Sequence, residues 1–98
     1  MLTVWKYETM PDMVNQVIEM PKGAAILSFG VDPRGKLCFW AQVDSEARLG
    51  ERVVSCIGTG WGMDSIIVNE GKFIGTAVRG DYVWHFFDLG EVNDRKEE

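Results

Sequence analysis

The stretch Ala24–Asp44, AAILSFGVDPRGKLCFWAQVD, decides the fold of this 98-residue chain. Two runs of alternating apolar residues flank the segment Val31–Lys36, in which Pro33 favours a turn and Gly35 can adopt a positive φ. This arrangement is typical of a β-hairpin. A period of two places Ala25, Leu27, Phe29 and Val31 on one face of the first strand, and Leu37, Phe39, Ala41 and Val43 on one face of the second. We expect both rows to face the core.

The other face of the second strand carries Trp40, together with Lys36, Cys38 and Gln42. Because the row on the opposite side already supplies a complete apolar face, the indole of Trp40 is left over for a contact outside the core. Large aromatic side chains anchor many protein interfaces. Trp40 is therefore a candidate binding residue, and the alternative is that it helps the other tryptophans to fill the interior.

Length and charge limit the classes of function. A chain of 98 residues with a net charge of −5 forms one domain, and a domain of that size buries only about 60–65% of its unfolded surface. A partner subunit would add stability, so we expect a homo-oligomer, a dimer or larger. The sequence has no cluster of lysine and arginine of the kind that neutralises phosphates, so we expect no direct binding to nucleic acid.

Cysteine usage and hydropathy bear on the compartment. Cys38 and Cys56 lie in two separate extended runs, and we expect both thiols to be reduced and buried, with a disulfide between them as the alternative. No apolar run approaches the ~20 residues that cross a bilayer, and the first residues lack the pattern of a secretory signal. We therefore expect no membrane association and a cytoplasmic location.

Further strands are expected on both sides of the central hairpin. Residues 2–8 alternate aromatic and charged side chains, which is typical of a strand. Residues 14–20 continue an extended pattern, and a short helix over 12–19 is the alternative. After a polar surface loop at 45–51, which has room for one helical turn, residues 52–57 are rich in β-branched side chains and predict another strand.

The last third of the chain holds one ambiguous stretch and a second hairpin. Residues 63–70 predict either a short strand or a loop that packs an apolar plug. Residues 72–78 and 82–88 predict a hairpin around Gly80, which is free to adopt a left-handed conformation. The strand over 82–88 is apolar on both faces, which is typical of a strand that is central in a sandwich, wraps a barrel or seals a subunit contact.

These segments predict an all-β fold. We expect a small single-domain antiparallel β-sandwich or curled β-barrel of six to seven strands, with room for one short helix. The domain covers residues 1–90, and the charged tail at 91–98 is expected to fray.

A glycine-rich loop follows the strand over 52–57; its residues are Gly58, Thr59, Gly60, Trp61 and Gly62. The loop lacks the Lys-Ser/Thr ending of a phosphate-binding P-loop and does not open a helix, so a tight turn with a partly exposed Trp61 is the simpler interpretation. If the loop binds a ligand, its N–H groups and the face of Trp61 would receive a nucleobase or a sugar. All five residues are candidate binding residues.

The spacing of titratable residues does not indicate an active site. His85 is the single histidine and shares an apolar row with Val83 and Phe87, so we expect a hydrogen-bonded imidazole rather than a catalytic one. One histidine and two distant cysteines do not match the spacing of a zinc site. We predict a non-enzymatic protein with no catalytic residues, no cofactor and no bound metal.

Six stretches form an ordered set that spans nearly the whole chain. They are Val4–Glu8, Ile18–Leu27, Leu37–Asp44, Ile57–Gly60, Phe73–Thr76 and Val83–Phe87. The set resembles a family of short, largely uncharacterised proteins of bacteriophages and prophages. The resemblance implies a compact β protein of the phage accessory type and carries over no catalytic residue. Where that family has a histidine and a proline after the Gly-Thr-Gly motif, this chain has Trp61 and Gly62, so a role for a loop histidine does not transfer.

The resemblance implies a function by analogy, because small acidic accessory proteins of phages often act by binding. The first expectation is an inhibitor or adaptor that contacts a host or phage protein, for example a host-defence protein, through Trp40, Glu46, Glu51 and the acidic surface. A second is a module that holds a nucleotide-like small molecule at the glycine-rich loop. A third is a virion or assembly component whose interfaces serve self-association.

Overall fold

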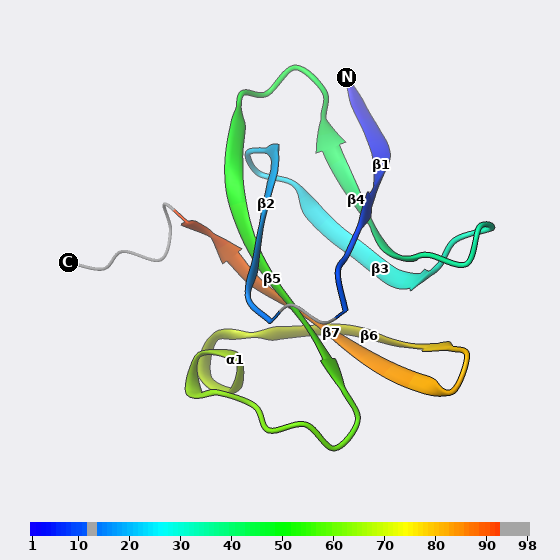
Figure 1. Ribbon diagram of the computed structural model, residues 1–98. Coiled ribbons are helices and arrows are strands. Elements are labelled where there is room, and N and C mark those ends of the chain that lie inside the picture. Colours follow the sequence, from blue (N-terminus) through cyan, green and yellow to red (C-terminus); the bar gives the residue numbers. More distant parts are fainter. Residues whose placement is uncertain (12–13, 93–98) are drawn as a thin grey trace.

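The computed structural model describes residues 1–11 and 14–92, and it consists of seven strands and one short helix (Figure 1). In chain order the elements are β1 (Leu2–Glu8), β2 (Gln16–Pro21), β3 (Ala25–Val31), β4 (Leu37–Asp44), β5 (Leu49–Gly58), α1 (Ser65–Glu70), β6 (Lys72–Arg79) and β7 (Tyr82–Glu91). The expected all-β class is confirmed.

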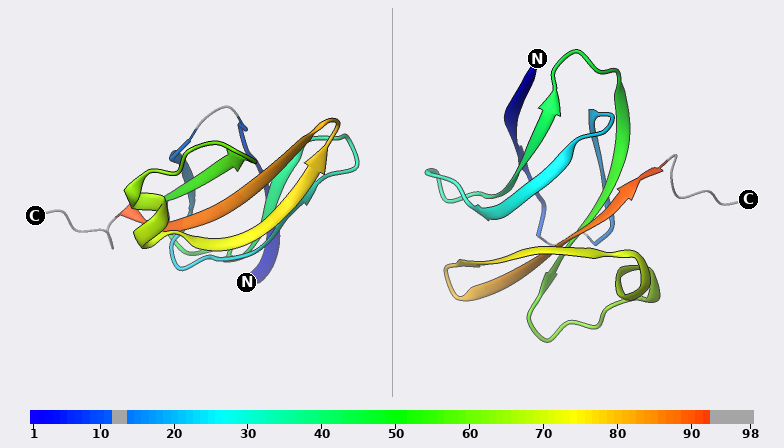
Figure 2. Two further views of the ribbon diagram at one scale, coloured as in Figure 1. Left: turned by 90° about the horizontal axis from the view of Figure 1, so that it is seen from below. Right: turned by 180° about the vertical axis from the view of Figure 1, so that it is seen from behind.

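The described strands form two antiparallel sheets and not a closed barrel. Sheet A has the order β1-β4-β3, and sheet B has the order β2-β5-β7-β6. The long strand β5 pairs with β2 along its first part and with β7 along its last part. The tips of the β3–β4 and β6–β7 hairpins extend to the same side of the molecule, and α1 lies at the other end of β6 (Figures 1 and 2).

The central hairpin of β3 and β4 forms as predicted, and its turn is held by Asp32. Gly35 takes the expected positive φ of 83°. The buried carboxylate of Asp32 accepts hydrogen bonds from the backbone N–H groups of Arg34 and Lys36 and from Lys6 Nζ on β1. The hydrogen bond from Lys6, followed by those from the backbone, holds the pKa of Asp32 well below its usual range. The turn is thus tied to the neighbouring strand.

Only half of the predicted core face of this hairpin is correct. On β4, Leu37, Phe39, Ala41 and Val43 are all buried. On β3, Phe29 is buried, but Leu27 is 52% exposed and Val31 is 40% exposed. A β-bulge at Leu27 inserts an unpaired residue and reverses the alternation before it, so that Ile26 rather than Ala25 packs against the core. Alternation read from sequence cannot show a bulge, because both parities carry apolar side chains here.

The core is organised by four stacked aromatic rings, three from sheet A and one from sheet B, and we call this set the aromatic ladder. It runs from Tyr7 of β1 to Phe39 of β4, then to Phe86 of β7 and to Phe29 of β3. Successive ring centroids are 5.2, 4.9 and 4.9 Å apart, and neither Phe39 nor Phe86 has any exposed surface. Offset stacking of this kind adds to the free energy gained by burying the rings. The ladder therefore joins sheet A to sheet B.

The two segments next to the hairpin resolve as strand. Residues 16–21 form β2, which confirms the strand interpretation; Asp12, in the alternative helix, lies outside the described residues. The expected loop at 45–51 is too long, because β5 begins at Leu49 and Glu51 lies inside it opposite Glu19. Pairing with β2 draws these polar residues into the sheet, which composition alone could not indicate.

The interpretation of residues 63–70 as strand or loop is wrong, because Ser65–Glu70 is helical. The carboxylate of Asp64 caps the helix by accepting a hydrogen bond from Ile67 N at 3.0 Å, and Gly71 N donates to Ile67 O at the other end. Ile67 is buried against Ile57 and Leu89 on the outer face of sheet B. The predicted apolar plug is therefore present, but on one helical turn whose cap and burial outweigh the strand preference of its β-branched residues.

The second hairpin has the predicted tight turn, and β7 lies inside sheet B between β5 and β6. Gly80 has a φ of 62°, as expected. β7 continues to Glu91, whose carboxylate accepts a hydrogen bond from Gly23 N. The expected tail at 91–98 otherwise falls mostly outside the described residues. Cys38 and Cys56 are both free and buried, which confirms the prediction of reduced thiols.

Candidate functional site

A groove lies at the end of sheet B where β5 stops and the β6–β7 hairpin turns. It has a volume of about 380 Å³. Its lining residues are Gly58, Thr59, Trp61, Asp81, Tyr82, Val83 and Trp84. We call this feature the aromatic groove, because three of its seven lining residues are large aromatics.

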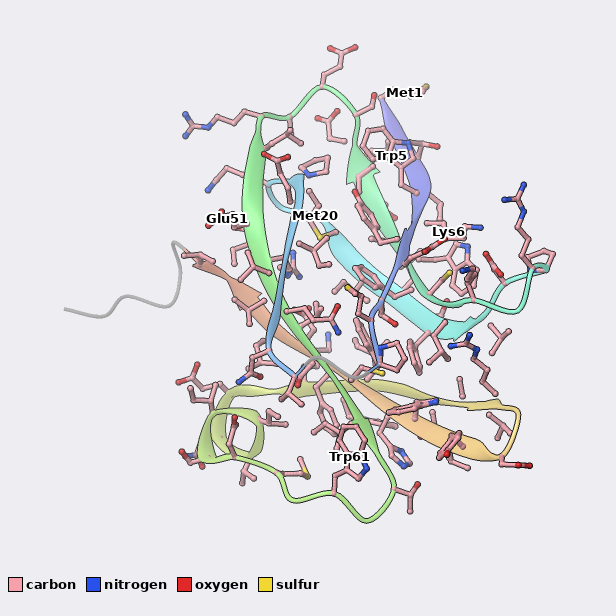
Figure 3. The ribbon with its side chains drawn as sticks, viewed as in Figure 1. Met1, Trp5, Lys6, Met20, Glu51 and Trp61 are labelled. Carbon is pink, nitrogen blue, oxygen red and sulfur yellow. The ribbon has the colours of Figure 1, made fainter. Side chains whose placement is uncertain are left out.

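The position of Trp61 follows from the turn that ends β5. Gly60 has a φ of 91°, and Trp61 N donates a hydrogen bond of 3.1 Å to Gly58 O, which folds the chain back on itself. The indole then lies directly over Gly58: a Cβ on that residue would be 2.9 Å from both Cε2 and Nε1 of Trp61. The glycine at this position therefore makes room for the ring. Figure 3 shows Trp61 beyond the last residues of β5.

Trp84 is the centre of the aromatic groove. It lies on the core-facing side of sheet B, opposite Gly58 on β5 and Ala77 on β6, and it packs against the edge of the main core. The rings of Trp61 and Trp84 are nearly perpendicular, at 88° with centroids 5.4 Å apart. Tyr82 extends the wall, with its centroid 6.1 Å from that of Trp84. Trp61 is 45% exposed and Tyr82 is 68% exposed, so the wall faces solvent.

His85 connects the turn that carries Trp61 to the neighbouring strand β6. Its two ring nitrogens lie 2.7 Å from Thr59 Oγ1 and 2.9 Å from Thr76 Oγ1. The backbone N–H of Thr59 also donates to Val83 O. Each ring nitrogen is thus within hydrogen-bond distance of one threonine hydroxyl, which can either donate or accept. This arrangement ties the turn after β5 to β7 and β6 and fixes the position of Trp61 relative to Trp84.

The lining of the groove is poorly suited to bind an anion. The backbone N–H groups of Thr59 and Trp61 are already bonded to backbone carbonyls, so these two loop amides do not point at a ligand. Among the described residues that line the groove, Asp81 carries the one charge, and it is negative. A phosphate group would therefore meet a carboxylate and no lysine or arginine in the lining.

The structure separates the other candidate residues from the groove. Trp40 is half-buried on the outer face of sheet A, in register with Lys6 and Ser28. Glu46 is exposed in the turn before β5, where its N–H donates to the carboxylate of Asp44. Figure 3 places Glu51 and Trp61 near opposite ends of β5. Of the eight candidates from sequence, Gly58, Thr59 and Trp61 line the groove, and Gly60 supplies its turn. A Cβ on Gly62 would meet open space.

Four groove residues were not predicted: Asp81, Tyr82, Val83 and Trp84. The signal for Tyr82 and Trp84 was present, because they alternate on one face immediately after the Gly80 turn. What the sequence does not contain is the register that sets Trp84 opposite Gly58. That register brings a ring from β7 beside a ring from a turn more than twenty residues earlier.

The other end of β7 carries a structural ion pair. Arg52 Nε and Nη2 donate to the two carboxylate oxygens of Asp88 at 3.0 and 2.9 Å, and Nη1 donates to Ala24 O. Burial alone would raise the pKa of Asp88, but hydrogen bonds from Arg52 and Gly90 and the charge of Arg52 hold it below its ordinary value. Both side chains are only 10% exposed, so this pair stabilises the domain and is not open to a ligand.

In residues 1–11 and 14–92, no group of three or more His, Cys, Asp or Glu side chains is placed to hold a metal ion. The described helix is too short to span a bilayer.

Comparison with known protein families gives a match over residues 1–97 to a domain of unknown function, DUF7352. Comparisons with curated proteins and with solved structures give no match.

Proposed function

We propose a function from the premise that the chain belongs to the DUF7352 family: it is a non-enzymatic binding protein that takes its partner at the aromatic groove. The observation that carries the proposal is the exposure of two large rings, Trp61 and Tyr82, against the half-buried Trp84. An exposed aromatic cluster on a small monomeric domain marks an interaction site more often than a scattered apolar residue does.

Rigidity supports the proposal. Trp61 is held by the turn after β5 and by the perpendicular contact with Trp84, and the turn is held in place by Thr59 and His85. Aromatic anchors that are already ordered before binding lose less conformational entropy when a partner docks. The groove therefore has the properties of the energetic centre of an interface.

A second candidate function is the binding of a nucleotide-like small molecule in the same groove. Its volume of about 380 Å³ lies at the small end of the range of roughly 300–1,000 Å³ for ligand pockets. A nucleobase could stack on Trp61, but the charge of Asp81 opposes the phosphate part of a nucleotide. The protein partner is therefore our first proposal and the base-like ligand the second.

The biological setting is proposed from the resemblance to phage and prophage proteins alone. In that setting the chain is an accessory protein in the cytoplasm of an infected bacterium, and a host-defence protein is one candidate target. Self-association as a dimer or larger assembly, as in a virion component, is a third proposal. The outer face of sheet A with Trp40 would be its contact, because that indole is half-buried and faces away from the core.

The test compares two tryptophan variants in affinity capture from phage-infected bacteria. Trp61→Ala removes a groove ring, and Trp40→Ala removes an aromatic of the same size on the other sheet. We expect a protein that is recovered with the wild type and with Trp40→Ala to be lost with Trp61→Ala. Recovery that depends on Trp40 and not on Trp61 would contradict the groove as the contact.

Three controls complete this test. Thermal melting shows whether each variant is folded. Sedimentation of the wild type measures self-association, and a monomer would exclude the assembly proposal. A thermal shift with a nucleotide panel tests the second candidate, because a ligand at 100 times its Kd adds about 2.7 kcal/mol to the free energy of unfolding; unchanged melting across the panel would count against it.

A further inference from the structure

Resting on the proposed function, we infer that the aromatic groove receives a cationic side chain of the partner protein, an arginine or a lysine. Three features of the lining favour a cationic side chain: the faces of its rings, the sign of its single charge, and the two loop amides that are already bonded within the protein.

The rings form a corner that suits a cation. Trp61 and Trp84 stand at 88° to one another, and Tyr82 continues the wall at 37° to Trp84. The negative electrostatic potential of an aromatic face attracts an ammonium or guanidinium group within about 6 Å, and tryptophan attracts it most strongly. Because Trp61 and Tyr82 are 45% and 68% exposed, a side chain can reach these rings from solvent without any movement of the sheets.

Charge selects a cation over an anion. Asp81 is exposed at the rim of the groove, and the chain as a whole carries a net charge of −5. Arg79 is the nearest basic residue by register, since it pairs with Tyr82, but it is not part of the lining. An approaching arginine or lysine is therefore attracted both by the rim carboxylate and by the overall field.

The loop amides argue in the same direction. Thr59 N donates to Val83 O and Trp61 N donates to Gly58 O, both at 3.1 Å. The Asp81 carboxylate and the ring faces present negative charge or negative potential to the groove. A cationic side chain has only donors and a positive charge to satisfy, so it matches this lining better than a phosphate or a carboxylate does.

The experiment uses the full chain and five capped pentapeptides, Gly-Gly-X-Gly-Gly. X is arginine, its neutral isostere citrulline, lysine, trimethyl-lysine, or norleucine as the neutral control for lysine. Titrations are followed by NMR on the indole N–H signals of Trp61 and Trp84. We expect citrulline to bind roughly 3- to 30-fold more weakly than arginine, because it loses exposed cation–π contacts and one surface charge pair.

Matched variants locate the effect. Asp81→Asn should weaken the arginine peptide about two- to fivefold and leave the citrulline peptide unchanged, since one exposed ion pair is removed. Arg79→Gln should strengthen the arginine peptide, because a nearby positive charge is removed. Glu46→Gln removes an equal charge from a distant turn and should change neither. The strength of arginine binding should also fall with added salt.

Each outcome decides a separate point. Tighter binding of the charged peptides than of their neutral controls supports the inference, and the order of arginine, lysine and trimethyl-lysine identifies the side chain. Equal binding of arginine and citrulline, and of lysine and norleucine, overturns it. Absence of any shift at Trp61 and Trp84 with all five peptides overturns it too. None of these results touches the proposed function, which fails only if partner capture does not depend on Trp61.

Discussion

Two aromatic clusters each include residues from the same face of β7, and these residues differ in their exposure to solvent. Phe86 of β7 belongs to the aromatic ladder and has no exposed surface, whereas Tyr82, four residues earlier on that face, is 68% exposed in the aromatic groove. Residue type and alternation are the same in both. The difference is the opposite layer: sheet A places Phe29 and Phe39 each 4.9 Å from Phe86, while the groove is met only by the turn that carries Trp61.

Burial along this face of β7 rises away from the hairpin tip. Tyr82 is exposed, Trp84 is half-buried, Phe86 is fully buried, and Asp88 ends the series in its ion pair with Arg52. The strand therefore passes from an open site to a closed core within one continuous element. We take the closed half to determine the stability of the domain and the open half to determine its binding.

The largest expected effect separates these two roles. Phe86→Ala removes the ring that links the sheets and should lower the free energy of unfolding by about 3–5 kcal/mol. Trp61→Ala should cost only about 1 kcal/mol, because nearly half of the indole is already in water and its contact with Trp84 is an edge contact. Urea denaturation of both variants measures the difference. Similar losses for the two would show that the groove is part of the core.

The second effect concerns the ion pair at the closed end of β7. Asp88→Asn leaves Arg52 without its bidentate carboxylate, and we expect a loss of about 2–3 kcal/mol at pH 7; water reaches a tenth of each side chain, so the loss is smaller than in a fully buried pair. The carboxylate of Glu91, 3.9 Å from Arg52, compensates in part.

The stability difference between the wild type and Asp88→Asn should depend on pH. The pKa of Asp88 is lower in the folded protein than in the unfolded chain, so its contribution to stability is present above about pH 4 and is lost as the pH falls through the folded pKa. The gap between wild type and Asp88→Asn should therefore close on acidification. A gap that is constant from pH 7 to pH 3 would contradict the pair as its source.

The third prediction concerns a substitution that adds one carbon atom beside the aromatic groove. Gly58→Ala places a Cβ 2.9 Å from the Trp61 indole and should displace the ring from Trp84, with less than about 1 kcal/mol lost because an exposed side chain can move. Gly62→Ala is the matched control, since its Cβ would meet open space. We expect partner capture to fall with Gly58→Ala alone, and the NMR signals of Trp61 and Trp84 to shift with it. Equal effects of the two substitutions would contradict the role of Gly58.

The closed half of the molecule was the predictable half. Alternation around the Gly35 and Gly80 turns predicted both hairpins. The two apolar faces of the last strand fitted a central strand, a barrel strand or a subunit contact, and the structure shows the first of these. The bulge at Leu27 was not predictable, because Ala25, Ile26 and Leu27 are all apolar and the pattern fits either parity. Nor was α1, because its cap and its buried Ile67 depend on a sheet face that only the folded chain provides.

The candidate site was predictable in part. The glycine-rich loop indicated an exposed Trp61, and the structure places it so. Tyr82 and Trp84 were seen as strand residues, and their part in the groove depends on a register between distant segments. Trp40 was chosen because it faces away from the core, which is correct, but orientation alone does not bring it near the other candidates.

The smallest expected effect concerns the reactivity of the two buried thiols, which belong to the closed half of the molecule. Burial raises the pKa of both Cys38 and Cys56 to about 11, so at pH 8 each remains a protonated thiol and should react far more slowly with an aromatic disulfide reagent than free cysteine does. At pH 7 and at pH 9 alike, the native protein should react far more slowly than free cysteine, because both pH values lie well below the raised pKa.

Substitutions in the aromatic ladder and in the aromatic groove should change the labelling rate of one thiol to different extents. Cys56 is in register with Phe86, so its labelling reports on opening of the aromatic ladder. If labelling requires global unfolding, Phe86→Ala should raise its rate roughly 100-fold or more and Trp61→Ala only about fivefold, in proportion to the free energies above. Mass spectrometry of the labelled peptides measures both rates. Equal acceleration by the two substitutions would mean that groove and core open as one unit, and the division of β7 into a binding half and a stabilising half would not hold.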